Sequence, residues 1–326
     1  MASIAKDLRA FLDGSTTALV EVASAKGSTP REKGAWMLVS RTAIFGTIGG
    51  GQLEYMAIDK ARMMLREPLP SPLWGGSASG LSEAKFESRG GGQGQKATPT
   101  PDLRSDPPHG GEGKALLSIP LGPEIGQCCG GRVEVSITQV DEGVKAHLLA
   151  TVESEEARLP HVYVFGGGHV GQALASAFSL LPLRTIVVES RADALEGMPA
   201  GIETRLTPMP EEMVRIAPAG SAFVVLTHDH ALDFLIAAEA LGRDDAAYVG
   251  MIGSKTKKAT FRNWYLKTAG GTNASFARLV SPIGGDAVKD KRPAVIAALA
   301  AAEIMTVLAK ASMDGVAVAG ASLQNT

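Results

Sequence analysis

The sequence predicts an α/β protein in which an N-terminal α+β domain precedes a Rossmann-like domain with a doubly wound parallel sheet. Three observations predict this fold. The chain has 326 residues, enough to bury two hydrophobic cores. Apolar segments of the first half are mostly strands, whereas strands alternate with helices in the second half, which is typical of a parallel sheet. The second half also opens with a glycine-rich turn, GGGHVG, between a strand and a helix.

The elements of the first half follow the periodicity of its apolar residues. Ile4, Leu8, Phe11 and Leu12 share one face of an amphipathic helix at the N-terminus. Strands are expected within residues 17–40 and at 43–47, 114–119, 132–140 and 145–152, and a helix at 52–65.

Two polar stretches interrupt these elements. Residues 71–113 contain 10 glycines and 5 prolines, which leaves little apolar surface to offset the entropy of ordering, so we expect a disordered insertion. A lid over a functional site is the alternative for a loop of this length. Residues 153–160 are expected to link the domains. The N-terminal domain then comprises residues 1–155 and the Rossmann-like domain residues 156–326.

The second half repeats a strand followed by a helix. Strands are expected at residues 162–165, 184–189, 222–227 and 246–252, with helices beginning at His169, Ala231 and Ser254. The alanine-rich residues 293–309 form a further helix, whose small side chains suit a core or a dimer interface. The apolar part of this helix, interrupted by Glu303, is expected to be too short to span a bilayer.

Composition and charge exclude several classes of protein. The chain carries 38 glycines, about 12% against roughly 7% in ordinary proteins, but no three-residue glycine period, which excludes a collagen-like fibre. Only 5% aromatic residues and a net charge of −2 argue against nucleic-acid binding. Two adjacent cysteines cannot form a disulfide framework, and the N-terminus lacks an apolar signal segment. We therefore expect a soluble, cytoplasmic protein that binds neither nucleic acid nor membrane.

The most informative motif is VYVFGGGHVGQAL. Gly166, Gly168 and Gly171 satisfy G-x-G-x-x-G directly after an apolar strand, and Glu189 ends the next strand. Such glycines let a phosphate approach backbone N–H groups at the N-terminus of a helix, and the acid accepts hydrogen bonds from a ribose. A phosphate-containing ligand is expected here, and a tight turn that binds nothing is the alternative.

A second loop in this half has a similar design. In YVGMIGSKTKK, Ser254 caps the following helix, while Lys255 and Lys257 face an anion at its positive end. A solvated run of lysines is the alternative.

Two histidines follow the strand that ends near residue 227. His228 and His230 flank Asp229 where ligands bind in open α/β sheets. A third spaced metal ligand is missing from the sequence, so we expect them to line the cofactor cleft rather than to hold a metal.

The first half offers a glycine loop and a pair of thiols. The triple glycine Gly49–Gly51 precedes a helix, so its amides could cradle an anion, or it could be a tight connection. In IGQCCGGRVEV, Cys128 and Cys129 lie near Arg132. A nearby cation lowers the pKa of a thiol and favours the thiolate, which ligates metals or carries sulfur. An inert buried cysteine is the alternative.

Six motifs together resemble the XdhC/CoxI family, the xanthine dehydrogenase accessory proteins. They occur here in the family's order: GSTPREKGAWMLV, GTIGGGQLE, QCCGGRVEV, VFGGGHVGQAL, YVGMIGSK and SPIGGD. The resemblance covers almost the whole chain except residues 71–113. The QCC form is closest to the XdhC branch, and Cys129 matches the cysteine found more widely in the family.

The resemblance implies a chaperone of the molybdenum cofactor rather than an enzyme. Such proteins bind the pterin–molybdenum cofactor while a cysteine desulfurase supplies the terminal sulfido ligand, and then deliver it to apo xanthine dehydrogenase. Cys129, together with Cys128, is expected near the molybdenum or its sulfur. The candidate cofactor-binding residues are Gly49, Gly50, Gly51, Cys128, Cys129, Arg132, Gly166, Gly167, Gly168, His169, Gly171, Glu189, His228, Ser254 and Lys255.

Three questions stay open at this point. The Gly166 loop could serve the phosphate of the cofactor or a separate nucleotide. An NAD(P)-dependent oxidoreductase would also use the glycine pattern and Glu189, although only His228 and His230 are candidates for its chemistry. An interaction scaffold with purely structural glycine loops is the other alternative. A homodimer is expected, on a surface that the sequence does not identify.

Overall fold

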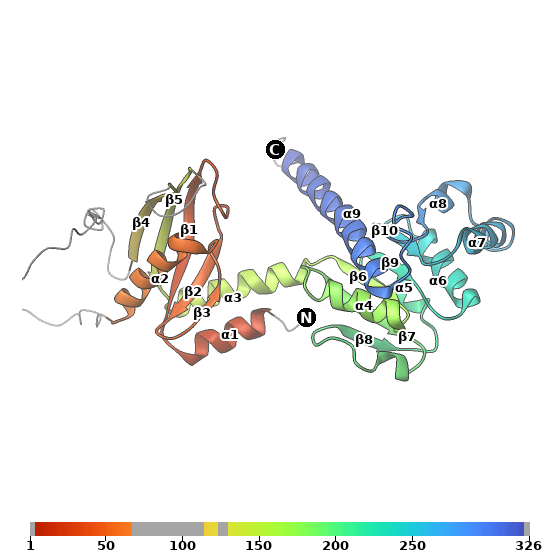
Figure 1. The fold of residues 1–326 in the computed structure, drawn as a ribbon, viewed down its shortest axis with the longest axis horizontal. Helices are drawn as coiled ribbons and strands as arrows, with labels where there is room; N and C mark the ends of the chain where they lie inside the picture. Colours follow the sequence, from red (N-terminus) through yellow and green to blue (C-terminus); the bar gives the residue numbers. More distant parts are fainter. Residues whose placement is uncertain (1–3, 67–113, 123–129, 323–326) are drawn as a thin grey trace, which may run out of the picture. The chain divides into compact units, whose positions relative to one another are not determined.

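The structure is a computed structural model that describes residues 4–66, 114–122 and 130–322, with side chains up to residue 311. The chain divides into two compact units. One consists of Leu8–Leu149 and the other of Met1–Asp7 together with Ala150–Thr326 (Figure 1). The predicted insertion at residues 71–113 lies outside the described residues.

The first unit is built on an antiparallel sheet with the strand order β3-β2-β1-β5-β4. Its strands are β1 (Thr17–Lys26), β2 (Trp36–Ser40), β3 (Ile44–Gly46), β4 (Lys114–Pro120) and β5 (Arg132–Gln139). Helix α2 (Gly51–Arg66) covers one face, and its buried Leu53, Ala57 and Ala61 pack on strand residues such as Val20 and Val135. Helix α1 (Ile4–Gly14) begins the chain as predicted. The α+β expectation for this region is confirmed.

One prediction in this region is wrong. Residues 145–152 do not form a strand, because they belong to helix α3 (Glu142–Ala157), which also includes the first five residues of the expected linker at 153–160. Asp141 starts the helix, since its side chain accepts a hydrogen bond from Val144 N (2.7 Å). Leu148 and Val152 are four residues apart and both buried, which is helical rather than strand spacing. The run ESEEA extends the helix because glutamate and alanine are good helix formers.

The second unit is a Rossmann-like domain. Its sheet has the order β11-β10-β9-β6-β7-β8, and every pair is parallel. The strands are β6 (His161–Phe165), β7 (Arg184–Glu189), β8 (Glu203–Leu206), β9 (Ala222–Val225), β10 (Tyr248–Met251) and β11 (Leu279–Val280). The helices are α4 (His169–Phe178), α5 (Glu212–Ile216), α6 (His230–Gly242), α7 (Lys255–Lys267), α8 (Asn273–Ala277) and α9 (Pro293–Ser322). The predicted doubly wound parallel sheet is confirmed.

Both faces of this sheet are buried, and consecutive strand residues divide between them. In β6, Val162 and Val164 pack with α4 and α9, whereas Tyr163 and Phe165 pack with α5, α6 and α7 (Figure 1). This alternation explains why the strands are nearly continuous apolar runs in the sequence. The sequence does not predict strands β8 and β11 or helices α5 and α8, because these elements have two to five residues and, unlike β6 or β9, are not runs of apolar residues.

Helix α9 is longer than the sequence indicated. Its segment Pro293–Ala311 has a mean hydropathy of 1.8 and is long and apolar enough to cross a membrane by those two criteria. The expectation that it is too short is therefore wrong. One face nevertheless belongs to the core, because Ala297, Ala300 and Ile304 are buried with α4 and the sheet. Glu303 accepts a hydrogen bond from the Tyr248 hydroxyl, which gives this acidic side chain a partner within the apolar segment.

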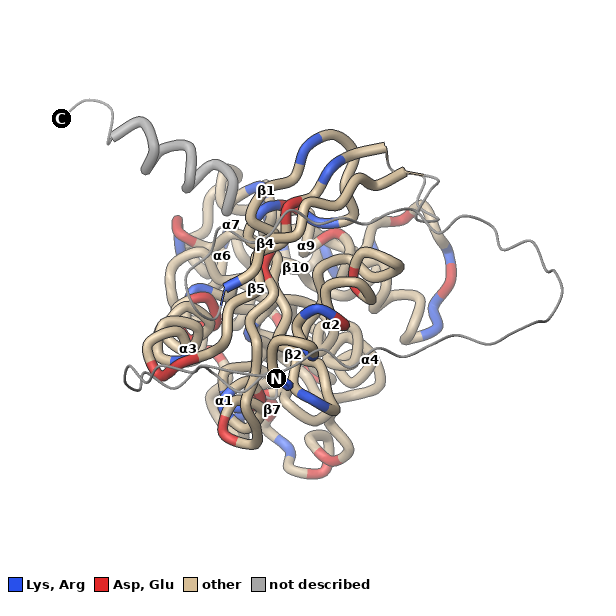
Figure 2. The backbone as a smooth tube through the Cα atoms, turned by 90° about the vertical axis from the view of Figure 1, so that its left-hand side faces the viewer, with Lys and Arg blue, Asp and Glu red and all other residues tan. Residues whose placement is uncertain are grey.

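Charges of both signs are spread along the backbone of each unit. Figure 2 shows basic and acidic residues interspersed on the described segments, in agreement with the net charge of −2. Helix α7 differs, because its sequence KTKKATFRNWYLK contains five basic residues and no acid.

Candidate functional site

The glycine loop of the second unit joins β6 to α4 and is held tightly by its surroundings. Gly166 N donates to Val188 O (2.9 Å), and a Cβ on Gly166 would lie 2.5 Å from Leu226 O. A Cβ on Gly171 would lie 2.0 Å from Gly166 O. Gly166 also has a φ of +121°, a conformation that favours glycine. Packing alone therefore requires glycine at both positions, whether or not a ligand binds.

Gly168 differs from its neighbours because it is exposed and faces open space. It is the N-cap of α4, has a φ of −68°, and no atom lies within 4 Å of the place of a Cβ. The N–H groups of Gly168 and His169 have no acceptor among the described residues. Helices α6, α7 and α8 are capped by the side chains of Asp229, Ser254 and Thr272. The N-terminus of α4 thus presents free amides and a positive dipole end, which is the arrangement that binds anions.

Glu189, the expected ribose acceptor, is directed into the loop itself. Its side chain is buried, and its two carboxylate oxygens accept from Gly167 N (2.9 Å), Ser190 N (2.9 Å) and Arg191 N (3.2 Å). Burial raises the pKa of Glu189, but these N–H donors outweigh it and hold the pKa below its ordinary value. Glu189 therefore fastens the glycine loop to the end of β7 and does not face a ligand as the sequence indicated.

A buried ion pair supports the neighbouring loops at the carboxyl edge of the sheet. Lys257 of α7 pairs with Asp233 of α6, whose side chain is fully buried. Asp233 also accepts from Thr227 N (2.9 Å) and the Thr227 hydroxyl (2.8 Å). The network ties the starts of two helices to the end of β9. Because its ammonium group is paired with Asp233, Lys257 does not face an external anion at the N-terminus of α7, contrary to the prediction.

The other predicted residues of this edge are exposed. Ser254 caps α7 by accepting from Lys257 N (3.2 Å), as predicted, and Lys255 lies in the first turn, open to solvent. His228 and His230 are exposed on either side of Asp229, whose carboxylate accepts from Ala231 N (2.7 Å). Among the described residues, no three histidine, cysteine or acidic side chains are placed to hold a metal.

The three glycine motifs of the first unit meet at one end of its sheet. A Cβ on Gly49 would lie 2.9 Å from the Pro30 side chain, and a Cβ on Gly131 would lie 2.4 Å from Ser28 O. Ser28 also forms an isolated bridge with Gly130. The GSTPREKG loop therefore contacts both the triple glycine and the glycines that follow the two cysteines. Only the structure brings these motifs together, because 80 residues separate Gly50 from Gly130 in the sequence.

The triple glycine is closed by a carboxylate of the chain. Glu54 accepts hydrogen bonds from the Thr47 hydroxyl, Ile48 N (3.1 Å) and Gly50 N (3.0 Å), and Gly49 N donates to Thr47 Oγ1 (3.1 Å). Burial raises the pKa of Glu54, but the hydrogen bonds from the Thr47 hydroxyl and the backbone N–H groups outweigh burial and hold the pKa below its ordinary value. The amides of Gly49 and Gly50 are therefore taken by Thr47 and Glu54 and do not cradle an external anion, which agrees with the alternative of a tight connection. Gly51 N, at the start of α2, has no acceptor among the described residues.

The thiol motif is described only in part. Cys128 and Cys129 lie outside the described residues. Arg132 is exposed at the start of β5, and its Nη1 donates to the Ser118 hydroxyl (3.1 Å). Two backbone hydrogen bonds of 2.7 Å join the described residues on either side of the thiol motif: Leu121 N donates to Gly131 O, and Gly130 N donates to Leu121 O.

Comparison with known families accounts for both units. Residues 11–71 match the model of the XdhC and CoxI family, and residues 162–304 match that of the XdhC Rossmann domain. The chain belongs to the XdhC and CoxI family. The second match covers the region of the parallel sheet, which agrees with the topology described above.

Two relatives place this XdhC chain among known proteins. It is 23% identical over 304 residues to the uncharacterized protein YqeB of Escherichia coli (strain K12), covering 89% of this chain but 43% of that protein. The chain thus spans less than half the length of that relative. A crystal structure described as a xanthine dehydrogenase from Bacillus halodurans superposes with a TM-score of 0.67 at 15% identity. That similarity covers 94% of this chain and 96% of the other and shows a shared fold.

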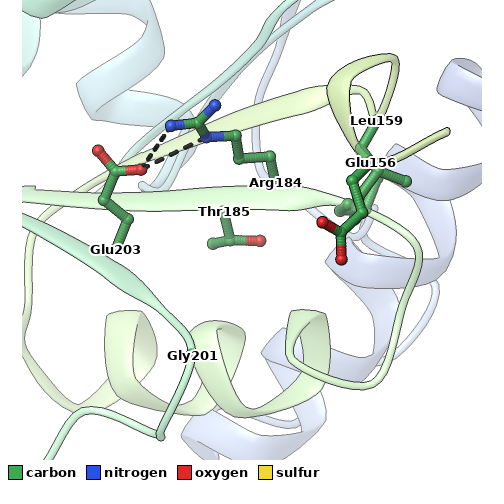
Figure 3. A pocket seen from close by; sticks show the side chains of 7 residues that line it. Glu156, Leu159, Arg184, Thr185, Gly201 and Glu203 are labelled. Atoms are coloured by element: carbon green, nitrogen blue, oxygen red, sulfur yellow. Dashed lines mark hydrogen bonds and ion pairs between the residues drawn. The ribbon is translucent and has the colours of Figure 1, made fainter. Parts of the chain in front are cut away.

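The XdhC Rossmann domain also has a pocket of about 300 Å³ at the start of β7. Figure 3 shows that Arg184 lies on one side of the strand, where it donates a hydrogen bond to Glu203, and that Thr185 lies on the other side. The Thr185 hydroxyl is buried and has no hydrogen-bond partner among the described residues. This pocket lies at the amino end of the strand, whereas ligands of open α/β sheets bind at the carboxyl ends, where the glycine loop lies.

Sequence reasoning missed the acids that organise the site. Glu54 could have been found as an acid in the first turn of a helix that follows three glycines. Asp233 carried a weaker signal, as the one charged residue in the otherwise apolar run HALDFLIAA. A charge in such a run is expected to have a partner.

Proposed function

We propose that this XdhC protein binds the molybdenum cofactor, holds it while a cysteine desulfurase supplies the terminal sulfido ligand, and delivers it to apo xanthine dehydrogenase. The observation that carries the proposal is the open N-terminus of α4. Its exposed amides at Gly168 and His169 suit the phosphate of the cofactor. Family membership supports an accessory role connected with xanthine dehydrogenase.

The residues of the chain fit this cofactor in distinct ways. Exposed Lys255 and His228 lie at the carboxyl edge of the same sheet and could extend the contacts of the phosphate site. Cys128 and Cys129 would offer soft thiolate ligands near molybdenum, and Arg132 would favour their ionised form. Bound in its client enzyme, the cofactor supplies a redox-active metal centre, so the role of this chain is to bind, orient and shield it.

The NAD(P)-dependent oxidoreductase alternative is less well supported. A dinucleotide needs an acid that accepts from its ribose. The carboxylate of Glu189 is instead engaged by three N–H groups of its own loop. Within the proposal the chain is a carrier and not a catalyst, and it acts in the cytoplasm as a homodimer.

Transfer of the cofactor tests the proposal. The chain purified anaerobically from cofactor-producing cells is mixed with apo xanthine dehydrogenase, and the recovered activity is measured. We expect the wild-type chain to restore activity and the Cys128→Ala/Cys129→Ala double variant to restore far less, with unchanged thermal unfolding as the control. Equal transfer and equal cofactor retention by the double variant would exclude the thiols from the site. A wild-type chain that binds apo enzyme equally well with and without cofactor would be a scaffold.

A further inference from the structure

Basic side chains gather at the end of the first sheet where the glycine motifs meet. Lys26 ends β1 and Arg132 begins β5, and the two are directly opposite each other in the register of the antiparallel pair. Both are exposed, as are Arg31 and Lys33 in the GSTPREKG loop. The stem of Arg31 passes Gly49, whose Cβ would lie 3.3 Å from Arg31 Cγ.

Within the described part of the chain, these cations form no ion pair with an acid. Among the described residues, no carboxylate oxygen lies within 4 Å of the charged groups of Lys26, Arg31, Lys33 or Arg132. Two acids occur nearby in the sequence, Glu32 and Glu134, and neither forms an ion pair with them. Like charges directly opposite each other in a sheet are destabilising, so a fixed pair of cations without a counter-charge is a cost that a bound anion would remove.

The floor of this cluster is made of glycines that allow close approach. Gly27 and Gly130 have φ values of +76° and +65°, and no atom lies within 4 Å of a Cβ on Gly130. The nearby amides of Gly49 and Gly50 are already taken by Thr47 and Glu54. An anion at this end of the sheet would therefore be held by side-chain cations and not by backbone amides.

We propose that Lys26, Arg31 and Arg132 form a second anion site, selective for a tetrahedral dianion such as a phosphate group. The planar guanidinium of Arg132 is held by Ser118 and can bind two oxygens at once, while Lys26 adds a point charge beside it. Three or four cations around a glycine floor match one compact dianion, whereas a nucleic acid requires an extended basic surface. The inference goes beyond the proposed function, because this site would bind phosphate whether or not the chain carries a pterin.

Titration with inorganic phosphate tests this site. The experiment uses the full chain carrying Gly168→Asp, since a carboxylate at that N-cap closes the amides of α4, and follows binding by 31P NMR at constant ionic strength set with chloride. We expect saturable binding that weakens about tenfold in Lys26→Gln and in Arg132→Gln, as for removal of a charge-assisted hydrogen bond. Lys114→Gln is the matched control, because Lys114 is exposed at the opposite end of β4 in the same sheet.

Three results would overturn the inference. The first is that phosphate does not bind saturably to the Gly168→Asp chain, and the second is that it binds with equal affinity to all three charge variants. A third contrary result is loss of apo xanthine dehydrogenase capture by Lys26→Gln and Arg132→Gln without any phosphate binding, which would assign the surface to an acidic protein. Pterin content of the same variants then distinguishes the source of the anion. In Lys26→Gln, whose residue has no part in the cofactor site proposed above, a fall in pterin identifies the cofactor's own phosphate, and unchanged pterin identifies a free oxyanion.

Discussion

The two glycine loops of this XdhC protein look alike in the sequence and differ in what they leave unbonded. Both precede a helix, and both are closed by a glutamate with a lowered pKa. In the first unit, Glu54 and Thr47 take the N–H groups of Ile48, Gly49 and Gly50. In the second unit, Glu189 takes only Gly167 of the glycine loop, so among the described residues the amide of the N-cap Gly168 has no acceptor, nor has that of His169. The first helix also leaves the amides of Gly51 and Gln52 without a described acceptor, so the two loops differ at the residue directly before the helix, where Gly50 is bonded and Gly168 is not.

The difference shows that a glycine-rich turn before a helix is not by itself an anion site. In the first loop an internal carboxylate already takes the amide of the residue directly before the helix, where an anion would bind. In the second loop Glu189 accepts from Gly167 and so fixes the loop, while the amides of Gly168 and His169 are still available to a phosphate. The position of the internal acid, and not the number of glycines, decides between the two cases.

The largest expected effect distinguishes structural glycines from the ligand-facing one. Gly171→Ala forces a Cβ to within 2.0 Å of Gly166 O and should lower the free energy of unfolding by about 3 kcal/mol, as for a severe overpacking. Gly168→Ala meets no atom within 4 Å and should lower it by no more than about 1 kcal/mol, because alanine is a poorer N-cap than glycine. Urea unfolding monitored by circular dichroism measures both. Equal losses would mean that Gly168 is also packed.

The two internal glutamates should differ in their contribution to stability. Glu189→Gln replaces a buried carboxylate that accepts three backbone N–H bonds, and we expect a loss of about 2 kcal/mol. Glu54→Gln, at a more exposed loop, should cost about 1 kcal/mol. Unfolding of each variant beside wild type at pH 7 measures the two losses. A larger loss for Glu54→Gln would reverse the comparison.

Acid should weaken both loops. The folded pKa of each glutamate lies below its ordinary value of 4.5. Each carboxylate therefore stabilises the fold fully above about pH 4.5 and loses this contribution as the pH falls through the lower folded pKa. We expect the acid-induced loss of stability to be smaller in Glu189→Gln than in wild type. Parallel stability curves between pH 6 and pH 3 would show that Glu189 does not contribute.

A small effect on stability should accompany a large effect on binding. Gly168→Asp places a carboxylate at a vacant N-cap with extended backbone, and it should raise the free energy of unfolding by less than about 1 kcal/mol. The same carboxylate should repel an anionic ligand from α4. Thermal unfolding tests the first expectation, and Gly168→Asn, which caps the helix without a charge, is the matched control.

The sequence was sufficient for most strands of both sheets and for most helices, because strands such as β6 and β9 are continuous apolar runs with clear boundaries. It failed at α3, where Leu148, Leu149 and Val152 are apolar enough for a strand and only the cap at Asp141 and the following glutamates indicate a helix. Residue periodicity does not distinguish short apolar segments of the two kinds.

The candidate site could be predicted only in outline. The motif at Gly166 identified the correct loop, but no pattern shows that the carboxylate of Glu189 turns inward, since this depends on the path of the chain after β7. The meeting of Ser28 with Gly130 and of Pro30 with Gly49 depends on sheet order, which joins β1 to β5 across more than 100 residues. Cys128 and Cys129 lie outside the described residues, so their role is still a prediction.

Pterin retention tests the central claim most directly. Wild type, Gly168→Asp and Gly168→Asn are purified anaerobically from cofactor-producing cells, and the molybdopterin released from each is quantified per folded chain. The account predicts pterin in wild type, a large loss in Gly168→Asp despite its unchanged or higher stability, and a smaller loss in Gly168→Asn. Well-folded wild-type protein without any pterin, or equal pterin in all three, would contradict it.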